Sequence, residues 1–152
     1  MRIMLEEDLS PATSLVDVGA RALDSLAYAS QYVRIEHLAG PISADGEEHI
    51  QRNIGRLLSA RQRLQRESPD GTWVLTAPLV FTPELYRNLE VFKMPRAQRE
   101  LELRQFWRTV VGSGLLACLH VVHGWQRSSG TVDEHTTALL SGVPIRYLDE
   151  SY

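Results

Sequence analysis

The apolar positions along the chain follow two kinds of pattern, one with helical spacing and one typical of strands. The helical pattern is the clearer one. Apolar residues three or four positions apart predict a helix whose N-cap and first residue are Ser10 and Pro11. The same spacing predicts helices over 47–67, from about Pro95 onward, and over about ten residues from Thr131. The stretch between Pro78 and Pro95 is expected to be irregular.

Short apolar or alternating runs predict the strands. They fall at 32–38, 72–76, 116–122 and 143–148. The run at 116–122 is almost continuously apolar, which is typical of a central strand buried on both faces.

Strands that alternate with helices indicate right-handed βαβ units and a parallel sheet covered on both faces. The sequence therefore predicts an α/β three-layer sandwich with a flavodoxin- or Rossmann-like sheet of four to five strands, in the order 2-1-3-4 and with a fifth strand left open. Residues 1–32 are expected to be an N-terminal helical extension, and residues 33–152 the α/β domain. The thin apolar stripe of the extra helix predicts packing on the outside of this domain or against another copy of the chain.

Strand order also predicts where a ligand would bind. In this order the first and third strands are neighbours, and a crevice opens between their carboxyl ends. The loops over 40–43 and 124–130 arrive there, and both contain glycine, which allows backbone to approach a ligand closely.

Composition narrows the classes of function. The 152 residues carry a formal charge of -3, which argues against a protein that coats a nucleic-acid polymer. No apolar run approaches the roughly 18 residues of a membrane span and no signal peptide is recognisable, so a cytoplasmic protein without a membrane partner is expected. A single cysteine, Cys118, excludes an internal disulfide and a four-thiolate zinc site.

Two groups of residues resemble cofactor sites but lack the required spacing or order. Cys118, His120, His123 and His135 have no recognised ligand spacing, so no metal is expected. The glycines at 112 and 114 precede a strand, whereas a dinucleotide fingerprint follows one and opens a helix. The chain is therefore expected to work without a cofactor.

The richest stretch in chemistry runs from His123 to His135. Glu134 is expected in the first turn of a helix, where the helix dipole favours an ionised carboxylate, the form a nucleophile requires. Ser128 and the amides near Gly130 would form a pocket for an anion or hydroxyl at the same helix end. Thr131-x-x-Glu134 also fits a capping box, in which Glu134 would do no chemistry, and both interpretations stay open.

Two motifs occur in order along the chain. The first is Leu38-Ala39-Gly40-Pro41-Ile42-Ser43, followed by Asn53 in the next helix. The second is Gly124-Trp125-x-x-Ser128-x-Gly130-x-x-x-Glu134-x-x-x-Ala138, followed by Gly142-Val143-Pro144-Ile145. Together they resemble the nucleoside 2-deoxyribosyltransferase-like superfamily, which includes nucleotide N-glycosidases, over roughly residues 34–148.

The resemblance implies a role for each matching residue. Glu134 would attack C1′ of the sugar and hold it covalently, as the nucleophile of a retaining glycosidase does. Ser128 would bind a 5′-phosphate or a nearby sugar oxygen, beside Gly130. Gly40, Pro41, Ile42 and Ser43 would line the sugar and base pocket, and Trp125 would either stack on a base or fill the sheet edge.

The chain also departs from the family pattern. His37 stands where many relatives have tyrosine, and Ser43 where nucleotide-specific members often have arginine. Acidic residues that are usual near Thr109 and around Leu115 or Ala117 are absent, which leaves the general acid to His37, His123 or Asp45.

The sequence thus predicts cleavage of the N-glycosidic bond of a nucleoside or nucleoside 5′-monophosphate, by hydrolysis or base transfer, with Glu134 and His37 as catalytic residues. The substrate-binding residues would be Gly40–Ser43, Asp45, Trp125, Ser128 and Gly130. The alternative is a nucleotide-binding or scaffold protein that turns over slowly or not at all. The family resemblance also implies a homodimer or larger homo-oligomer.

Overall fold

The strands form one parallel sheet. In the computed structural model, which describes residues 5–152 apart from the side chains at 91 and 92, the strands are β1 (Arg34–Ala39), β2 (Thr72–Thr76), β3 (Cys118–Val121) and β4 (Ile145–Tyr147). Their order is β2-β1-β3-β4, and every neighbouring pair is parallel. The predicted order 2-1-3-4 is confirmed, and the described residues contain no fifth strand.

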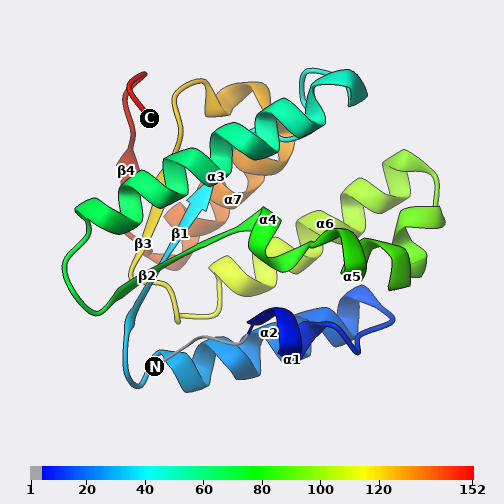
Figure 1. Cartoon of the computed structure of the whole chain (residues 1–152), viewed down its shortest axis with the longest axis horizontal. Helices are drawn as coiled ribbons and strands as arrows, with labels where there is room; N and C mark the ends of the chain where they lie inside the picture. The colour runs from blue at the N-terminus through cyan, green and yellow to red at the C-terminus, as the bar shows by residue number, and fades with distance from the viewer. Residues whose placement is uncertain (1–4) are drawn as a thin grey trace.

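The helices lie between and around these strands, as Figure 1 shows. The α-helices are α1 (Leu5–Leu9), α2 (Leu15–Ala29), α3 (Ile50–Glu67), α4 (Ala77–Val80), α5 (Pro83–Asn88), α6 (Arg96–Val111) and α7 (Ser129–Ser141). Three 3-10 turns add η1 (Glu47–His49), η2 (Glu90–Lys93) and η3 (Trp125–Arg127).

The layers match the predicted three-layer sandwich. Helix α3 contacts β1 and β2 on one face, and α7 contacts β3 and β4 on the other, with α6 packed against α7 (Figure 1). Helix α2 packs on α6, and α1 on α2 and α4. None of the described helices is long and apolar enough to cross a lipid bilayer.

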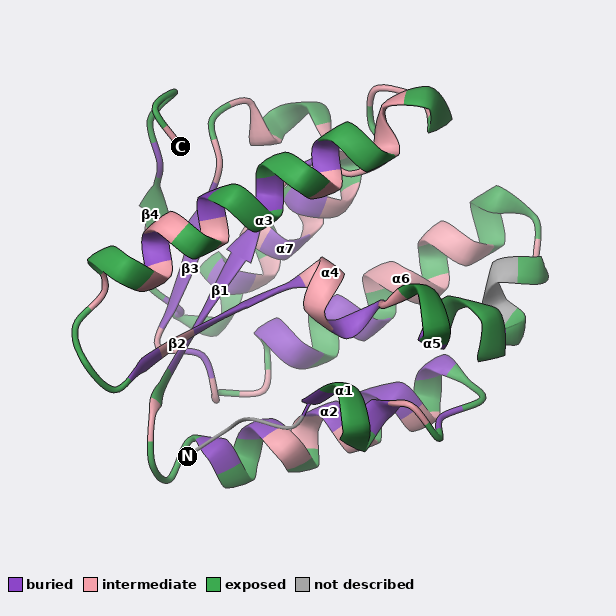
Figure 2. Cartoon of the chain, in the orientation of Figure 1, coloured by how far each residue is buried: buried purple, intermediate pink, exposed green. Residues whose placement is uncertain are grey.

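The core is divided by the sheet, and the buried strands run through its middle in Figure 2. A small cluster beneath α3 contains Leu38, Leu57 and Val74. A larger cluster on the opposite face joins Ile35 and Leu119 to residues of α1, α2, α6 and α7. The N-terminal helices therefore share the core of the α/β domain, while the first four residues of the 1–32 extension lie outside the described part.

Two local predictions were wrong. The cap predicted at Ser10 and Pro11 is at Ser14 instead, whose hydroxyl oxygen accepts a hydrogen bond from the Asp17 amide at 3.1 Å. The separate helix α1 precedes it because Leu5 and Leu9 both find buried positions.

The stretch predicted as irregular folds into α4, α5 and η2. Prolines 78 and 83 lie in the first turns of α4 and α5, where their missing N–H groups cost nothing. Short helices that start on proline have too few residues to show a helical period, so the pattern could not predict them.

The sheet register brings two loops together. Ala39 at the end of β1 is level with Val121 at the end of β3, so the loops that follow them leave the sheet side by side. These are the loops predicted to form the crevice. Gly124, with φ 77°, makes the turn after β3 in a conformation that favours glycine.

Candidate functional site

A cavity of about 350 Å³ opens at the carboxyl ends of β1 and β3. It is lined by seven of the site residues predicted from the sequence: His37, Gly40, Ile42, Ser43, Ser128, Gly130 and Glu134. Strand β1, the loop after it and the start of α7 supply these residues, so the sheet topology assembles the site.

A buried histidine–carboxylate pair lies in this cavity. Nε2 of His37, on β1, is 2.9 Å from Oε1 of Glu134, on α7. His37 is completely buried and Glu134 is only 7% exposed. Polar groups removed from water in this way are costly unless paired, so each residue stabilises the other.

The protons in this pair follow from the hydrogen bonds. A carbonyl oxygen only accepts, so Nδ1 of His37 carries a proton and donates it to the carbonyl of Leu75, at 3.2 Å. Nε2 is then the ring nitrogen that meets Oε1 of Glu134. The imidazole is stacked on the indole of Trp107, with ring centroids 4.7 Å apart, so the orientation of the ring is fixed from three sides.

The second carboxylate oxygen of Glu134 is left for a ligand. Among the described residues, Oε2 takes part in no hydrogen bond or ion pair, while Oε1 is held by His37. A carboxylate that lines a cavity with one oxygen fixed and the other unpaired has the arrangement of a positioned nucleophile or base.

The start of α7 differs from the prediction. Its N-cap is Ser128, whose hydroxyl accepts the Thr131 amide at 3.2 Å, so Thr131 is inside the helix and caps nothing. The capping-box interpretation is therefore wrong, because Glu134 lies in the second turn and contacts His37 instead. The expected position in the first turn is wrong too, and the dipole contributes little at that depth.

Positive charge gathers at the rim above Glu134. The amides of Ser129 and Gly130 open α7, and neither donates to an acceptor among the described residues. Arg104 of α6 donates to the Ser129 hydroxyl at 2.7 Å, and Arg127 also lines the cavity. Helix amides and two guanidinium groups form a suitable environment for a phosphate or carboxylate.

Other predicted residues lie outside this cavity. Pro41 and His123 line a neighbouring one. Asp45 lines neither cavity, and its carboxylate accepts from Asn53 at 3.1 Å and lies 3.6 Å from Arg127. Trp125 is stacked on His135 with centroids 4.3 Å apart, so it packs at the sheet edge beside Tyr147 rather than against a ligand in the cavity.

Helix α6 supplies a wall that sequence reasoning missed. The lining residues on it are Arg96, Glu100, Leu103, Arg104 and Trp107. Their spacing of three and four places them on one helix face, and that period was the available signal. The same period is typical of a helix face that packs in a core, so it did not distinguish a cavity wall from buried packing.

The histidines and the cysteine of the metal pattern do not converge. His120, on β3, is hydrogen-bonded to Glu36, whereas His135, on α7, is hydrogen-bonded to Tyr147. Within residues 5–152, no group of three or more His, Cys, Asp or Glu side chains is arranged to hold a metal ion.

Fold and site together define a parallel α/β protein with a buried His–Glu pair in a cavity at the sheet's carboxyl edge, below a cationic rim. Comparisons of the chain with protein-family models, with curated proteins and with solved structures find no match. The resemblance carried by the sequence motifs therefore stays a prediction.

Proposed function

We propose that the chain cleaves the N-glycosidic bond of a nucleoside 5′-monophosphate, with Glu134 as the nucleophile. The observation that carries the proposal is the His37–Glu134 pair, buried in a cavity with one carboxylate oxygen left for a ligand. A carboxylate in this position can stabilise an oxocarbenium-like centre and then trap it.

The chemistry would run in two steps. Oε2 of Glu134 forms a bond to C1′ of the sugar, and the C1′–N bond breaks with its electron pair leaving on the base. The departing base takes a proton from a general acid. Water then attacks C1′ and releases Glu134, which gives hydrolysis, or the nitrogen of a second base does so, which gives transfer.

The general acid has to be a side chain of the cavity that can reach the departing base. Of the three candidates from the sequence, only His37 lines the cavity, and both of its ring nitrogens are held there, by Leu75 and by Glu134. Glu100 of α6 lines it as well, and its carboxylate accepts from Arg96 at 2.8 Å. A base bound between α6 and the loop after β1 would lie within reach of this second acid.

The rim supports a phosphorylated substrate. Arg104, Arg127 and the first amides of α7 surround the same opening, and they can hold a dianion through charge-assisted hydrogen bonds. Substrate phosphate at the rim would set the sugar over Glu134. Nucleosides without the phosphate are therefore expected to be poorer substrates.

The test is release of free base from a panel of nucleosides and their 5′-monophosphates, followed by chromatography. The wild type should release base, and Glu134→Gln should lower the rate by about a thousandfold or more, because the nucleophile is lost. Glu84→Gln changes an exposed carboxylate on α5 and serves as the matched control. Absence of release from every substrate, or full activity of Glu134→Gln, would refute the proposal.

A second candidate function is binding without turnover. The observation behind it is that Glu100, the acid on α6, is neutralised by Arg96. This function would be favoured if calorimetry shows that the wild type binds a nucleotide, that Arg104→Ala binds it more weakly, and that no product forms.

We also propose that the protein is cytoplasmic and acts as a homo-oligomer. A single free cysteine, Cys118, is buried, which is compatible with a reducing compartment. The exposed side of α2 still carries apolar residues such as Val16 (82% exposed) and Tyr28 (59%), which a second copy could cover.

A further inference from the structure

A second cavity, of about 380 Å³, lies on the other side of the loop after β1. Its floor is apolar and consists of Leu57, Ala60 and Val122, from α3 and the end of β3. Tyr152, near the chain end, closes one side. These apolar side chains can contact one face of a small ring, while most of the remaining lining is polar.

Two arginines, Arg56 and Arg127, line the rim of this second cavity, with His123 beside them and Glu150 as the only carboxylate among the lining residues. None of the ion pairs between described residues involves Arg56, so its charge is uncommitted. His123 is 3.5 Å from Glu150, a contact between exposed side chains that an incoming anion can replace.

A buried amide fixes one polar position in the wall. Asn53 is 4% exposed, and its Nδ2 donates to the carbonyl of Ile42 at 2.9 Å and to Asp45 at 3.1 Å. These two bonds fix the orientation of the amide, and they leave Oδ1 as an acceptor with no donor among the described residues. A ligand with a hydroxyl or amino group can supply that donor.

A thin wall separates the second cavity from the one that holds Glu134. A Cβ on Gly40 would come within 2.7 Å of Val122 and 3.1 Å of Leu57, so backbone and side chains are in close contact there. Gly40 lines the first cavity, Val122 the second, and Leu57 both. The two cavities are therefore neighbours, and Gly40, Leu57 and Val122 lie between them.

We propose that the second cavity binds a small organic anion with an apolar ring, one anionic group at Arg56 and His123, and a hydrogen-bond donor directed at Asn53. The proposed function uses neither Arg56 nor Asn53 nor His123, and binding in the second cavity does not depend on chemistry at Glu134.

The experiment is a protein-observed NMR titration with 4-hydroxybenzoate, which combines ring, anion and donor. Binding in the millimolar range is expected for a molecule of this size, with shifted amide signals around Asn53 and His123. Benzoate lacks the donor and phenol lacks the anion, so both should bind more weakly. Arg56→Ala should weaken 4-hydroxybenzoate about tenfold.

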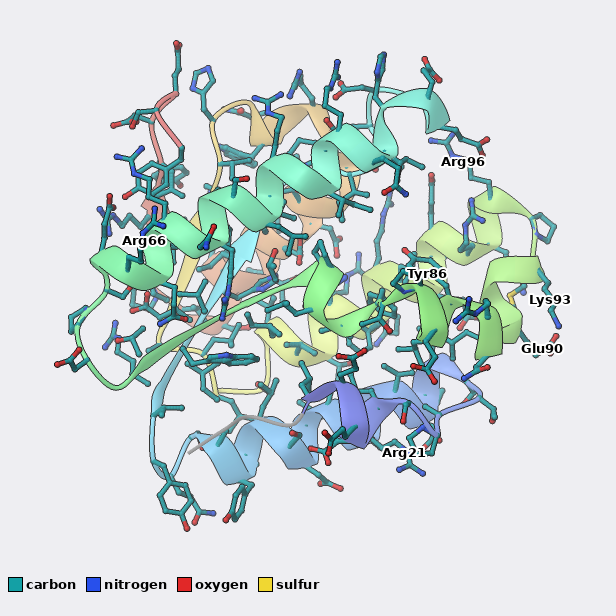
Figure 3. All side chains as sticks on the ribbon, viewed as in Figure 1. Arg21, Arg66, Tyr86, Glu90, Lys93 and Arg96 are labelled. Carbon is teal, nitrogen blue, oxygen red and sulfur yellow. The ribbon has the colours of Figure 1, made fainter. Side chains whose placement is uncertain are left out.

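Matched variants separate this site from its neighbours. Arg66→Ala removes another exposed arginine of α3, labelled in Figure 3 toward the end of the helix that leads to β2, and should leave affinity unchanged. Glu150→Gln should tighten binding severalfold, because it removes the carboxylate that competes for His123. Equal affinities in the wild type and Arg56→Ala, shifts centred on Ser128–Glu134, or no shifts at all would overturn the proposal.

Discussion

Two neighbouring residues of β1 take part in separate histidine–carboxylate pairs on opposite faces of the sheet. Glu36 accepts from His120 at 2.7 Å beneath α3, and His37 lies 2.9 Å from Glu134 beside α6 and α7. Successive side chains of a strand point to opposite faces, which is why adjacent residues serve different pairs. Only the second pair faces a ligand cavity.

The first prediction at this scale concerns His37. His37→Phe keeps a ring against Trp107 but removes both hydrogen bonds, so Leu75 and Glu134 lose their donor. We expect the free energy of unfolding to fall by about 1–3 kcal/mol, measured by urea denaturation. In His37→Gln an amide can still donate to Glu134, and this variant should lose less. Equal stability of His37→Phe and the wild type would contradict the assigned bonds.

The second prediction concerns the pH dependence of stability. Burial lowers the pKa of His120, although Glu36 opposes the shift. Burial raises the pKa of Glu36, but hydrogen bonds from Arg34 and His120 outweigh it, so the net shift is downward. Both groups bind protons more readily in the unfolded chain, so their contribution is complete above about pH 6.5 and is lost as the pH falls.

Urea denaturation between pH 8 and pH 4, read as a free energy of unfolding, tests this dependence. The slope from His120 should be at most about 1.4 kcal/mol per pH unit and begin near pH 6.5. His120→Gln does not titrate, so it should flatten the curve there, whereas His123→Gln, at a histidine with a 62% exposed side chain, should not. An unchanged slope in His120→Gln would show that another group is responsible.

At the scale of elements, the loop after β1 is held by close packing of Gly40 against Val122 and Leu57. Gly40→Ala should therefore reduce the free energy of unfolding by about 1–3 kcal/mol, because the new methyl group is crowded. Gly55, on the outer side of α3, has open space, so Gly55→Ala should stabilise by about 0.5–1 kcal/mol. Thermal unfolding of both variants checks the pair.

A double variant tests the cause. Val122→Ala removes Cγ2, which would lie 2.7 Å from the new Cβ, so Gly40→Ala should cost less in that background than in the wild type. If the stability changes of the two substitutions were strictly additive, Val122 would not be the residue that crowds a side chain at position 40.

Elements with a strong period were predictable, and elements set by tertiary contact were not. The strand over 72–76 has the predicted bounds, since a short β-branched and aromatic run between turn signals allows little else. The capping box at Thr131 stayed open in the sequence because a sequence does not show backbone conformation, and in the structure Ser128 holds the extended conformation that a cap needs.

The candidate site was predictable where it follows from topology. The loops after β1 and β3 meet because parallel strands end at one edge, and Glu134, Ser128 and Gly130 come with them. The contribution of α6 was not predictable, because its position depends on packing against α2 and α7, contacts between segments distant in sequence. The sequence left two roles open for Trp125, stacking on a base or filling the sheet edge. In the structure Trp125 is stacked on His135, which favours the packing role.

At the scale of the whole molecule, the expected assembly is a homodimer or larger oligomer. Light scattering should give at least twice the mass of the 17.2 kDa chain. If α2 forms the contact, Val16→Asp should shift the mass toward the monomer, since it places a charge in an apolar interface. Thr136→Asp, on α7, is the control. A monomeric mass for the wild type would contradict the prediction.

The two halves of the buried pair are 97 positions apart in the chain. During synthesis, His37 leaves the ribosome early and has no carboxylate to meet until α7 has been made and has docked. A nascent chain therefore contains the strand but not the buried pair. The pair, and the cavity wall that it forms, can arise only after α7 has been made and has docked on the sheet.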